Sequence, residues 1–375
     1  MRNEEQVWLE NLYDRLCLKI KAECERTGSG IPYIPEGGAY YDMGKENIAW
    51  WTNGFWPGIL WQMYTATGEE LYKKNAEAVE QRMEQMLEEF VGLDHDAGFL
   101  WLLSAVADYR ITGNKRSCIN ALHAANILAG RFNPAGGFIR AWGCEGSSEK
   151  SGWMIIDCLM NLPLLYWASE ETGDPRFSKI AANHADTAMK AFIRGDGSAN
   201  HIVEFDPASG EMIKSYGGQG YGEGSSWTRG QSWGLYGFML SYLHTQNNAY
   251  LETAERIANY FIANIPDSGL IPVDFRQPED VKLEDSTAAA IASCGLIELA
   301  RQKDGRQQKI YLNAALKMLQ ALTKNSFNWN EEEDNLLTKC TAAYHDEKHE
   351  FSIIYGDYFF LEALMKLTDK ELFIW

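Results

Sequence analysis

The stretch GFWPGILWQMYTATGEELYKKNAEAVEQRMEQML, residues 54–87, contains two helical segments of different character, separated at Thr67 and Gly68. The first segment is apolar on nearly every side, and the second carries a polar stripe beside its apolar residues. A helix that is apolar all round must be buried, whereas a striped helix keeps one face in water. The stretch therefore predicts an inner helix, a turn and an outer helix.

The same pair of segments recurs along the chain. Similar units occupy residues 97–130, 154–192, 229–265 and 286–322, and an apolar helix at residues 353–367 can pair with the N-terminal helix. An open solenoid would carry polar capping repeats and a more regular period. We therefore predict an all-α fold in which six inner and six outer helices close a double ring, an (α/α)6 barrel, as a single domain over residues 1–375. Strand-like sequence is limited to short pieces such as HIVEFD and GLIPVDF.

The composition restricts the partners and the compartment. The chain contains 52 acidic and 34 basic residues, for a net charge of −18 at pH 7. Nucleic acids and anionic membranes need a basic face, so neither is expected as a partner. No apolar run reaches the length of a membrane span, and the N-terminus is a charged amphipathic segment rather than a secretion signal. Seven cysteines without closely spaced pairs indicate free thiols in a reducing compartment. We expect a cytoplasmic protein, or a periplasmic one if a leader has been removed.

One carboxylate, Asp157, lies within an apolar run, SGWMIIDCLMNLPLLYW (residues 151–167), that predicts a buried helix. An ionised carboxylate in an apolar interior is unfavourable unless it is paired or its pKa rises until it holds a proton. A protonated, half-buried acid can donate and retake a proton near neutral pH. The alternative is a structural acid near a helix end that is hydrogen-bonded to backbone N–H groups or paired with an arginine. The residues alone leave both interpretations open.

Polar and glycine-rich segments lie at the joints between the helix pairs, and in a closed ring most of these joints converge on one rim. In the joint GLDHDAGF, Asp94, His95 and Asp96 could contact a substrate, cap a helix or bind a metal. A metal is the weakest option because no HExxH motif, cysteine-rich partner or regular series of carboxylates accompanies them. Asp96 and Asp157, from different inner helices, form the kind of carboxylate pair that sugar chemistry commonly uses.

The segment GGQGYGEGSSWTRGQSWG contains Gln219, Arg229 and Trp233 but lacks the lysine and the spacing of a phosphate-binding P-loop. Arg229 could bind an anion or form an ion pair with one of the many acidic residues. His201 could contact a substrate or be a structural histidine. Trp51 could line the site or belong to the core.

At these positions the sequence resembles the unsaturated glucuronyl hydrolases, glycoside hydrolase family 88. The motifs WTNGFW, LDHDAGF, IIDCLMNLPLLYWA, SSWTRGQSWGLYGF, DSTAAAIASCGL and YGDYFFLEAL occur in the family's order and at similar spacing. The resemblance implies an (α/α)6 barrel with Asp157 as the general acid/base and Asp96 as a second essential acid. It also implies substrate contacts by further residues, namely Trp51, His201, Gln219, Arg229, Trp233 and Tyr344. We expect His95, which adjoins Asp96, to contact the substrate as well. No metal or cofactor is expected.

The resemblance further implies activity on oligosaccharides that polysaccharide lyases leave with a 4,5-unsaturated uronic acid at the non-reducing end. The C4=C5 bond is a vinyl ether, so an acid that protonates C4 creates an oxocarbenium-like centre at C5 that water can attack. The resulting hemiketal opens and releases the rest of the chain. The expected substrates are unsaturated uronyl disaccharides and short glycosaminoglycan oligosaccharides.

Other functions remain open from the sequence. An unsaturated rhamnogalacturonyl hydrolase would act on pectin fragments with the same fold, a sugar epimerase on this barrel typically relies on paired histidines, and a binding protein would hold the disaccharide without consuming it. The segment KCTAAYHDEKHEF, with Lys339, His345 and Lys348, is expected beside the neighbouring sugar. It lacks a serine-and-lysine arrangement suited to sulfate, so the sulfation preference stays open.

Overall fold

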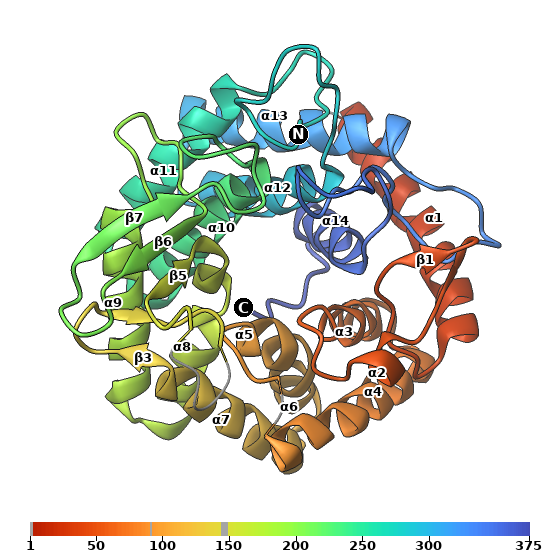
Figure 1. Ribbon diagram of the computed structural model, residues 1–375. Helices are drawn as coiled ribbons and strands as arrows, with labels where there is room; N and C mark the ends of the chain where they lie inside the picture. The colour runs from red at the N-terminus through yellow and green to blue at the C-terminus, as the bar shows by residue number, and fades with distance from the viewer. Residues whose placement is uncertain (1–2, 91, 144–148) are drawn as a thin grey trace.

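The structure is a computed structural model that describes residues 3–90, 92–143 and 149–375. It is mostly helical, which confirms the predicted class, and Figure 1 shows helices near a common centre surrounded by further helices. Cys144 and part of the joint RAWGCEGSSEKSGW lie outside the described residues. Within the described ranges, no helix is both long and apolar enough to cross a membrane.

Buried and half-exposed helices alternate along the chain, as the repeated pattern predicts. The buried helices are α3 (Phe55–Thr67), α5 (Ala97–Trp101) with its continuation α6 (Ala107–Thr112), α8 (Leu162–Thr172), α10 (Thr228–Thr245), α12 (Ser286–Arg301) and α14 (Ile354–Leu367). The half-exposed helices are α1 (Asn3–Thr27), α4 (Glu70–Glu89), α7 (Lys115–Gly130), α9 (Pro175–Ala191), α11 (Asn248–Ala263) and α13 (Gly305–Asn325). A short helix, α2 (Met43–Glu46), precedes α3, and a π-helical turn, η1 (Leu102–Val106), joins α5 to α6.

In three of the helix pairs, a glycine ends the first helix. Gly68, Gly113 and Gly173 cap α3, α6 and α8 with φ values of 71°, 73° and 70°. A left-handed residue at a helix end satisfies the last carbonyl groups, and glycine adopts that conformation without a Cβ penalty. The turn expected at Thr67 and Gly68 is therefore confirmed, and its physical cause is the same in three of the helix pairs.

The core is a continuous apolar cluster whose buried residues run from Leu9 to Trp375. Near the centre of the ring, the rings of Phe55 and Phe359 lie 5.7 Å apart, and the Trp375 ring stacks on Phe359 at 5.9 Å. Figure 1 accordingly places the C-terminus near the centre. The buried helices thus pack on one another through aromatic side chains.

The prediction of one continuous helix over residues 151–167 is wrong. Strand β5 (Trp153–Ile155) and a 3₁₀ turn, η2 (Ile156–Met160), precede α8, which begins only at Leu162. Pro163 lies in the first turn of α8, where its missing N–H has no helical partner to lose. Upstream of it, the backbone of β5 pairs with a neighbouring strand instead of continuing the helix.

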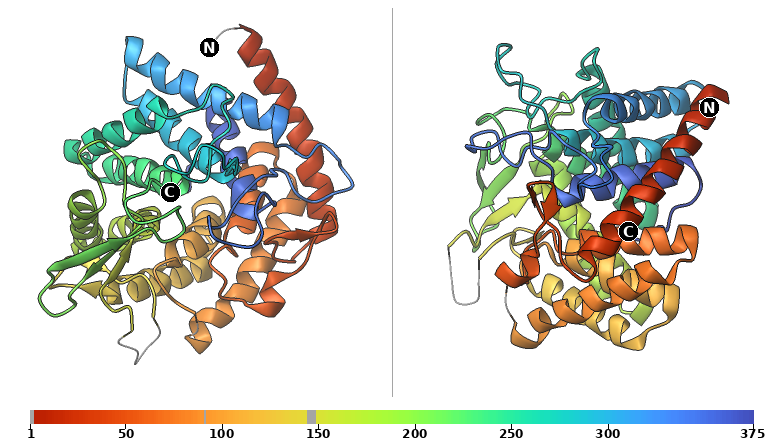
Figure 2. Two further views of the ribbon diagram at one scale, coloured as in Figure 1. Left: turned by 45° about the horizontal axis from the view of Figure 1, so that its top comes forward. Right: turned by 90° about the vertical axis from the view of Figure 1, so that its right-hand side faces the viewer.

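Strand β5 belongs to a three-stranded antiparallel sheet with β6 (Ile202–Phe205) and β7 (Met212–Tyr216). Strand β6 corresponds to the strand-like piece HIVEFD, whereas GLIPVDF forms only isolated bridges. Two small hairpins join β1 (Pro35–Glu36) to β2 (Ala39–Tyr40) and β3 (Phe132–Asn133) to β4 (Phe138–Ile139). The right-hand view of Figure 2 shows the three-stranded sheet at one end of the ring, which we call the rim.

Candidate active site

The three-stranded sheet brings Asp157 and His201 together. Asp157 follows the end of β5, and His201 immediately precedes β6, so in an antiparallel pair both lie at the same edge of the sheet. The backbone N–H of Ile156 donates to the carbonyl of His201 at 3.1 Å. His201 Nε2 lies 3.5 Å from Asp157 Oδ1, and the Asp157 side chain is 19% exposed.

A backbone contact fixes the orientation and the tautomer of His201. The N–H of Gln219, just after β7, donates to His201 Nδ1 at 2.9 Å. Since Nδ1 accepts a hydrogen bond, the ring proton is on Nε2, the atom that faces Asp157. Gly218 has a φ of +57°, and a Cβ there would lie 2.0 Å from His201 Nδ1. Only glycine therefore permits this close approach of the backbone to the ring.

Asp96 is the residue directly before the buried helix α5. Its own N–H donates to Asp94 Oδ1 at 2.9 Å, and its Oδ1 accepts a hydrogen bond from Asn161 Nδ2 at 3.2 Å. His95 Nε2 lies 3.6 Å from Asp96 Oδ2. Asp96 makes no side-chain capping bond to α5, so the capping alternative is not realised. Asn161 closes the turn that carries Asp157 and thereby connects the two acids.

The two acids differ in their protonation. Burial raises the pKa of Asp96 to about 8, and the negative charge of Asp157 adds to this effect. Burial also raises the pKa of Asp157, but hydrogen bonding to His201 and the positive charges nearby outweigh burial, so this pKa lies below its ordinary value. The interpretation that burial keeps Asp157 protonated is therefore wrong for the free protein, in which the pKa of Asp157 is lowered and that of Asp96 is raised.

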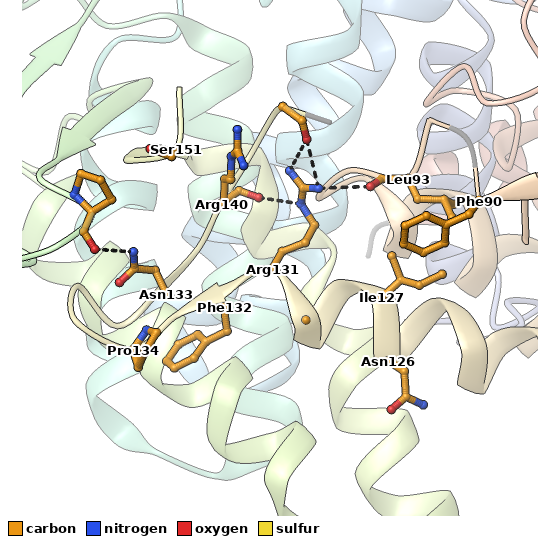
Figure 3. A pocket seen from close by; sticks show the side chains of 13 residues that line it. Phe90, Leu93, Asn126, Ile127, Arg131, Phe132, Asn133, Pro134, Arg140 and Ser151 are labelled. Atoms are coloured by element: carbon orange, nitrogen blue, oxygen red, sulfur yellow. Dashed lines mark hydrogen bonds between the residues drawn. The ribbon is translucent and has the colours of Figure 1, made fainter. Parts of the chain in front are cut away.

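Two clusters of hydrogen bonds from arginine side chains hold the loops that lead to Asp96 and His201. Arg131 donates to the carbonyl of Leu93 at 3.1 Å (Figure 3). It also donates to the carbonyl of Ala141 at 3.0 Å, which accepts the N–H of His95 as well. This cluster fixes the loop that leads to Asp96. The surface pocket beside Arg131, of about 650 Å³, is lined by neither of the two acids.

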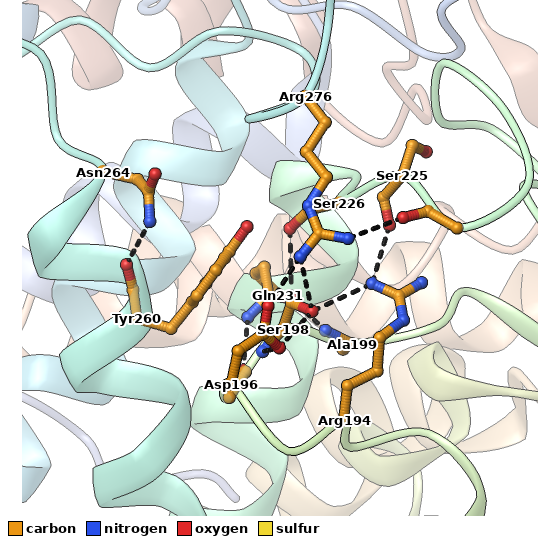
Figure 4. Close-up of polar contacts among 12 residues, drawn as sticks. Arg194, Asp196, Ser198, Ala199, Ser225, Ser226, Gln231, Tyr260, Asn264 and Arg276 are labelled. Carbon is orange, nitrogen blue, oxygen red and sulfur yellow. Dashed lines mark hydrogen bonds and ion pairs between the residues drawn. The ribbon is translucent and has the colours of Figure 1, made fainter.

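The second cluster fixes the loop that leads to His201 (Figure 4). Arg194 donates to the carbonyl of Ser225 at 2.9 Å. Arg276 pairs with Asp196 at 2.7 Å. Both arginines thus connect the loop before β6 to the segments after β7 and α11. The positions of His201 and of the backbone around Gln219 are therefore coupled.

The aromatic residues expected in the site are not equivalent. Trp51 is half-buried and contacts Tyr355 at 5.0 Å, so part of its ring is open at the rim. Trp233 is fully buried, with its ring 5.3 Å from Phe99. Trp142, which the sequence did not single out, is half-buried with its ring 6.5 Å from that of His95. Trp142 belongs to the joint RAWGCEGSSEKSGW, and its position in this joint is the sequence signal that could have identified it.

The remaining expected residues surround the same rim. Arg229 is buried and forms an ion pair with Asp285 at 3.0 Å. Of the two roles expected for Arg229, anion binding and pairing with an acidic residue, the structure contains the second. Gln219 Nε2 donates to the carbonyl of Ala342 at 2.9 Å, and the N–H of Tyr344 donates to the carbonyl of Gln219 at 2.8 Å. The late segment around Tyr344 therefore folds over the loop that fixes His201.

Lys339 is one of the cations expected beside a neighbouring sugar. Its side chain forms an ion pair with Glu284 at 3.0 Å. His345 and Lys348 are exposed, and His345 Nε2 contacts the carbonyl of Tyr221 at 2.9 Å. In the part of the chain that the structure describes, no cluster of His, Cys, Asp and Glu side chains is arranged to hold a metal ion. The groups that the structure brings together at the rim are two carboxyl groups, each contacted by a histidine side chain.

A helical ring with two such carboxyl groups at its rim indicates a glycoside hydrolase. Residues 32–366 match Glycosyl Hydrolase Family 88, and the chain belongs to this family. The unsaturated glucuronyl hydrolase of Bacillus sp. (strain GL1) is 37% identical over 368 residues, which cover 96% of this chain and 97% of that protein. The unsaturated chondroitin disaccharide hydrolase of Streptococcus pyogenes serotype M1 is 36% identical, over 84% of this chain and 80% of that protein.

A solved structure of an unsaturated glucuronyl hydrolase variant with dGlcA-Glc-Rha-Glc has a TM-score of 0.89 to this chain and 36% sequence identity, covering 96% of both chains. The family resemblance and the expected enzyme class are thereby confirmed.

Proposed function

We propose that this protein is an unsaturated glucuronyl hydrolase that removes the 4,5-unsaturated uronic acid from the non-reducing end of glycosaminoglycan oligosaccharides. Relatives that align with most of the chain bear this activity or its chondroitin-disaccharide form in their names. The observation that carries the proposal is the pair of Asp96 and Asp157, two carboxyl groups connected through Asn161 and contacted by His95 and His201. Hydration of a vinyl ether needs one proton donor and one proton acceptor.

Asp157 delivers a proton to C4 and then, as a carboxylate, takes a proton from the water that attacks C5. Because Asp157 is ionised in the free protein, it gains its proton when the substrate binds. The uronate carboxylate is a second negative charge beside it, and the sugar displaces water; both changes raise the pKa of a carboxyl group. Asp96 holds the proton of the pair beforehand and passes it to Asp157 as the substrate binds, and the Asp96 carboxylate then accepts hydrogen bonds from the ring hydroxyls. The two groups therefore titrate as one unit.

The other residues hold the sugar. Trp51 supplies an aromatic face against which a sugar ring packs. His95 and His201 contact the acids directly, and Gln219 and Tyr344 close the loop above His201. Two buried residues act from behind the surface: Trp233 supports Phe99 beneath the site, and Arg229 contributes positive charge near Asp157 while it is paired with Asp285.

The architecture that we propose is a closed (α/α)6 double ring that forms one domain. The alternation of buried and half-exposed helices supports it, and so does the packing of α14 against α3, which joins the last repeat to the first. One apolar cluster that extends from Leu9 to Trp375 supports a single domain.

The test of the function is turnover of unsaturated disaccharides derived from chondroitin, hyaluronan, heparin and pectin, followed by loss of the double-bond absorbance. We expect turnover of at least one glycosaminoglycan disaccharide and little of the pectin disaccharide. Preference for the pectin product would favour the rhamnogalacturonyl hydrolase. Binding measured by calorimetry without loss of absorbance would favour a binding protein. Either of these two results would contradict the proposal.

A further inference from the structure

The sheet at the rim carries a second, smaller apolar cluster on the face turned away from the main core. Residues directly opposite each other on neighbouring strands share a face, and Ile155 is paired with Ile202. These two side chains are buried together with Ala141, separately from the main core. The alternate residues Met154 and Val203 belong to the main core instead. The small cluster is therefore covered by side chains outside the main core.

Three half-buried aromatic rings cover it. The rings of Trp142 and Trp153 lie 6.0 Å apart at 46°, and those of Trp153 and Tyr216 lie 4.9 Å apart at 27°. Trp142 also lies 6.5 Å from His95, edge to face. These three rings, which we call the aromatic strip, therefore begin at the active site and continue along the sheet away from it.

Cations lie over the aromatic strip in a protein whose net charge is −18. Lys150 Nζ is 5.3 Å from the ring centres of both Trp142 and Trp153, and Lys214 Nζ is 4.3 Å from that of Tyr216. Both lysines are exposed. A cation above an aromatic face is stabilised there and remains available to an anion that approaches the same face.

We propose that Trp153 and Tyr216, with Lys150 and Lys214, bind the saccharide units beyond the first two of an anionic oligosaccharide whose unsaturated end occupies the active site. This inference rests on the proposed function and adds a preference for substrates longer than a disaccharide. Sugar faces pack against aromatic rings, and the lysines pair with uronate or sulfate groups. The strip is continuous with the site, and a related structure contains a tetrasaccharide.

The test compares an unsaturated hyaluronan disaccharide with the corresponding tetrasaccharide. We expect the wild-type KM to be lower for the tetrasaccharide. Trp153→Ala should raise the tetrasaccharide KM about 3- to 10-fold, as expected for loss of one aromatic contact, and leave both disaccharide constants unchanged. Trp153→Phe, which keeps an aromatic face, should restore most of the difference.

Trp329→Ala is the matched control, because Trp329 is also half-buried with a cation, Arg15, above its ring but lies on other elements. It should alter neither KM. The double variant Lys150→Gln, Lys214→Gln changes only exposed side chains, so it tests the inference even if Trp153→Ala folds poorly. It should raise the tetrasaccharide KM at low salt and lose its effect at high salt.

The outcomes separate the two proposals. No turnover of either substrate contradicts the proposed function. Normal turnover of the disaccharide, with a tetrasaccharide KM that neither set of variants changes, contradicts only the role of the aromatic strip. An equal change in both KM values would also overturn this role, because the strip would then act on the first two sugars.

Discussion

Both ends of the ring of helices bury carboxyl groups, but they treat them differently. At the end opposite the rim, Lys366 is buried and lies 2.7 Å from Glu298, 3.3 Å from Glu362 and 3.2 Å from Glu371. Lys366 is eleven residues beyond Tyr355, the rim residue beside Trp51, and a helical rise of 1.5 Å per residue separates them by about 16 Å. At the rim, neither Asp96 nor Asp157 has a Lys or Arg ion-pair partner among the residues that the structure describes.

The difference separates a structural cluster from a chemical one. Although burial lowers the pKa of Lys366, the surrounding carboxylates raise it above its ordinary value, so the cation persists among them. Asp96 and Asp157 contact amide and imidazole groups instead, which leaves one proton to be shared between them. Removing the cation from a buried cluster is therefore expected to destabilise the fold, whereas acids without a fixed cation remain free to exchange protons.

The largest expected effect is on catalysis. Asp157→Asn removes both the proton donor and the base, and should lower kcat by about 10²–10⁴-fold on an unsaturated disaccharide. The fold should persist because the amide keeps the shape of the side chain, which circular dichroism checks. Near-normal turnover would show that Asp157 is not the acid/base. Glu298→Gln, at the opposite end, is the matched control and should leave kcat unchanged in the folded fraction.

The second prediction concerns the opposite end. Lys366→Met leaves three buried carboxyl groups without their shared cation and should lower the free energy of unfolding by about 3–5 kcal/mol. Chemical denaturation measures this change, and kcat per folded molecule should remain that of the wild type. Lys73→Met, at a half-exposed pair with Glu77, is the control and should change stability little. A strong loss of kcat with normal stability would contradict the division between the two ends.

The third prediction uses the raised pKa of Asp96. Its folded-state pKa is about 8 and its ordinary value is 3.8, so the folded protein binds the extra proton between these values. The stability that this proton contributes is complete below about pH 4 and is lost as the pH rises through 8. Asp96→Asn mimics the neutral form, so its melting temperature relative to wild type should increase from pH 5 to pH 8 by about 2–4 °C. A difference that does not vary with pH would show that Asp96 is ionised.

The smallest expected effect is a shift of the pH profile. The imidazole of His201, with Nε2 3.5 Å from Asp157 Oδ1, helps to hold the pKa of Asp157 below its ordinary value. In His201→Ala this pKa should rise, so the acidic limb of kcat/KM should move to higher pH while the alkaline limb, set by Asp96, stays near pH 8. His123→Ala, on the exposed side of α7, should leave both limbs in place. An unchanged acidic limb in His201→Ala would contradict the assignment.

The sequence predicted more of the fold than of the electrostatics. Helix pairs with glycine turns follow from local patterns. Asp96 and Asp157, which are distant in sequence and were expected at one rim, are connected through Asn161. The helix expected over residues 151–167 was wrong because Pro163 and the pairing of β5 with β6 override the apolar pattern. Trp142 and Asn161 were missed because nothing local in the sequence shows which side chain will face another loop.

By itself, the sequence determined the alternation of buried and half-exposed helices, the turns between them and the presence of two acids near apolar segments, because these depend on residue type and spacing along the chain. Only the tertiary structure decided which acid holds the proton. A pKa depends on groups that are close in space. Here His201, brought beside Asp157 by β6, stabilises the ionised form of Asp157, while burial and the negative charge of Asp157 raise the pKa of Asp96.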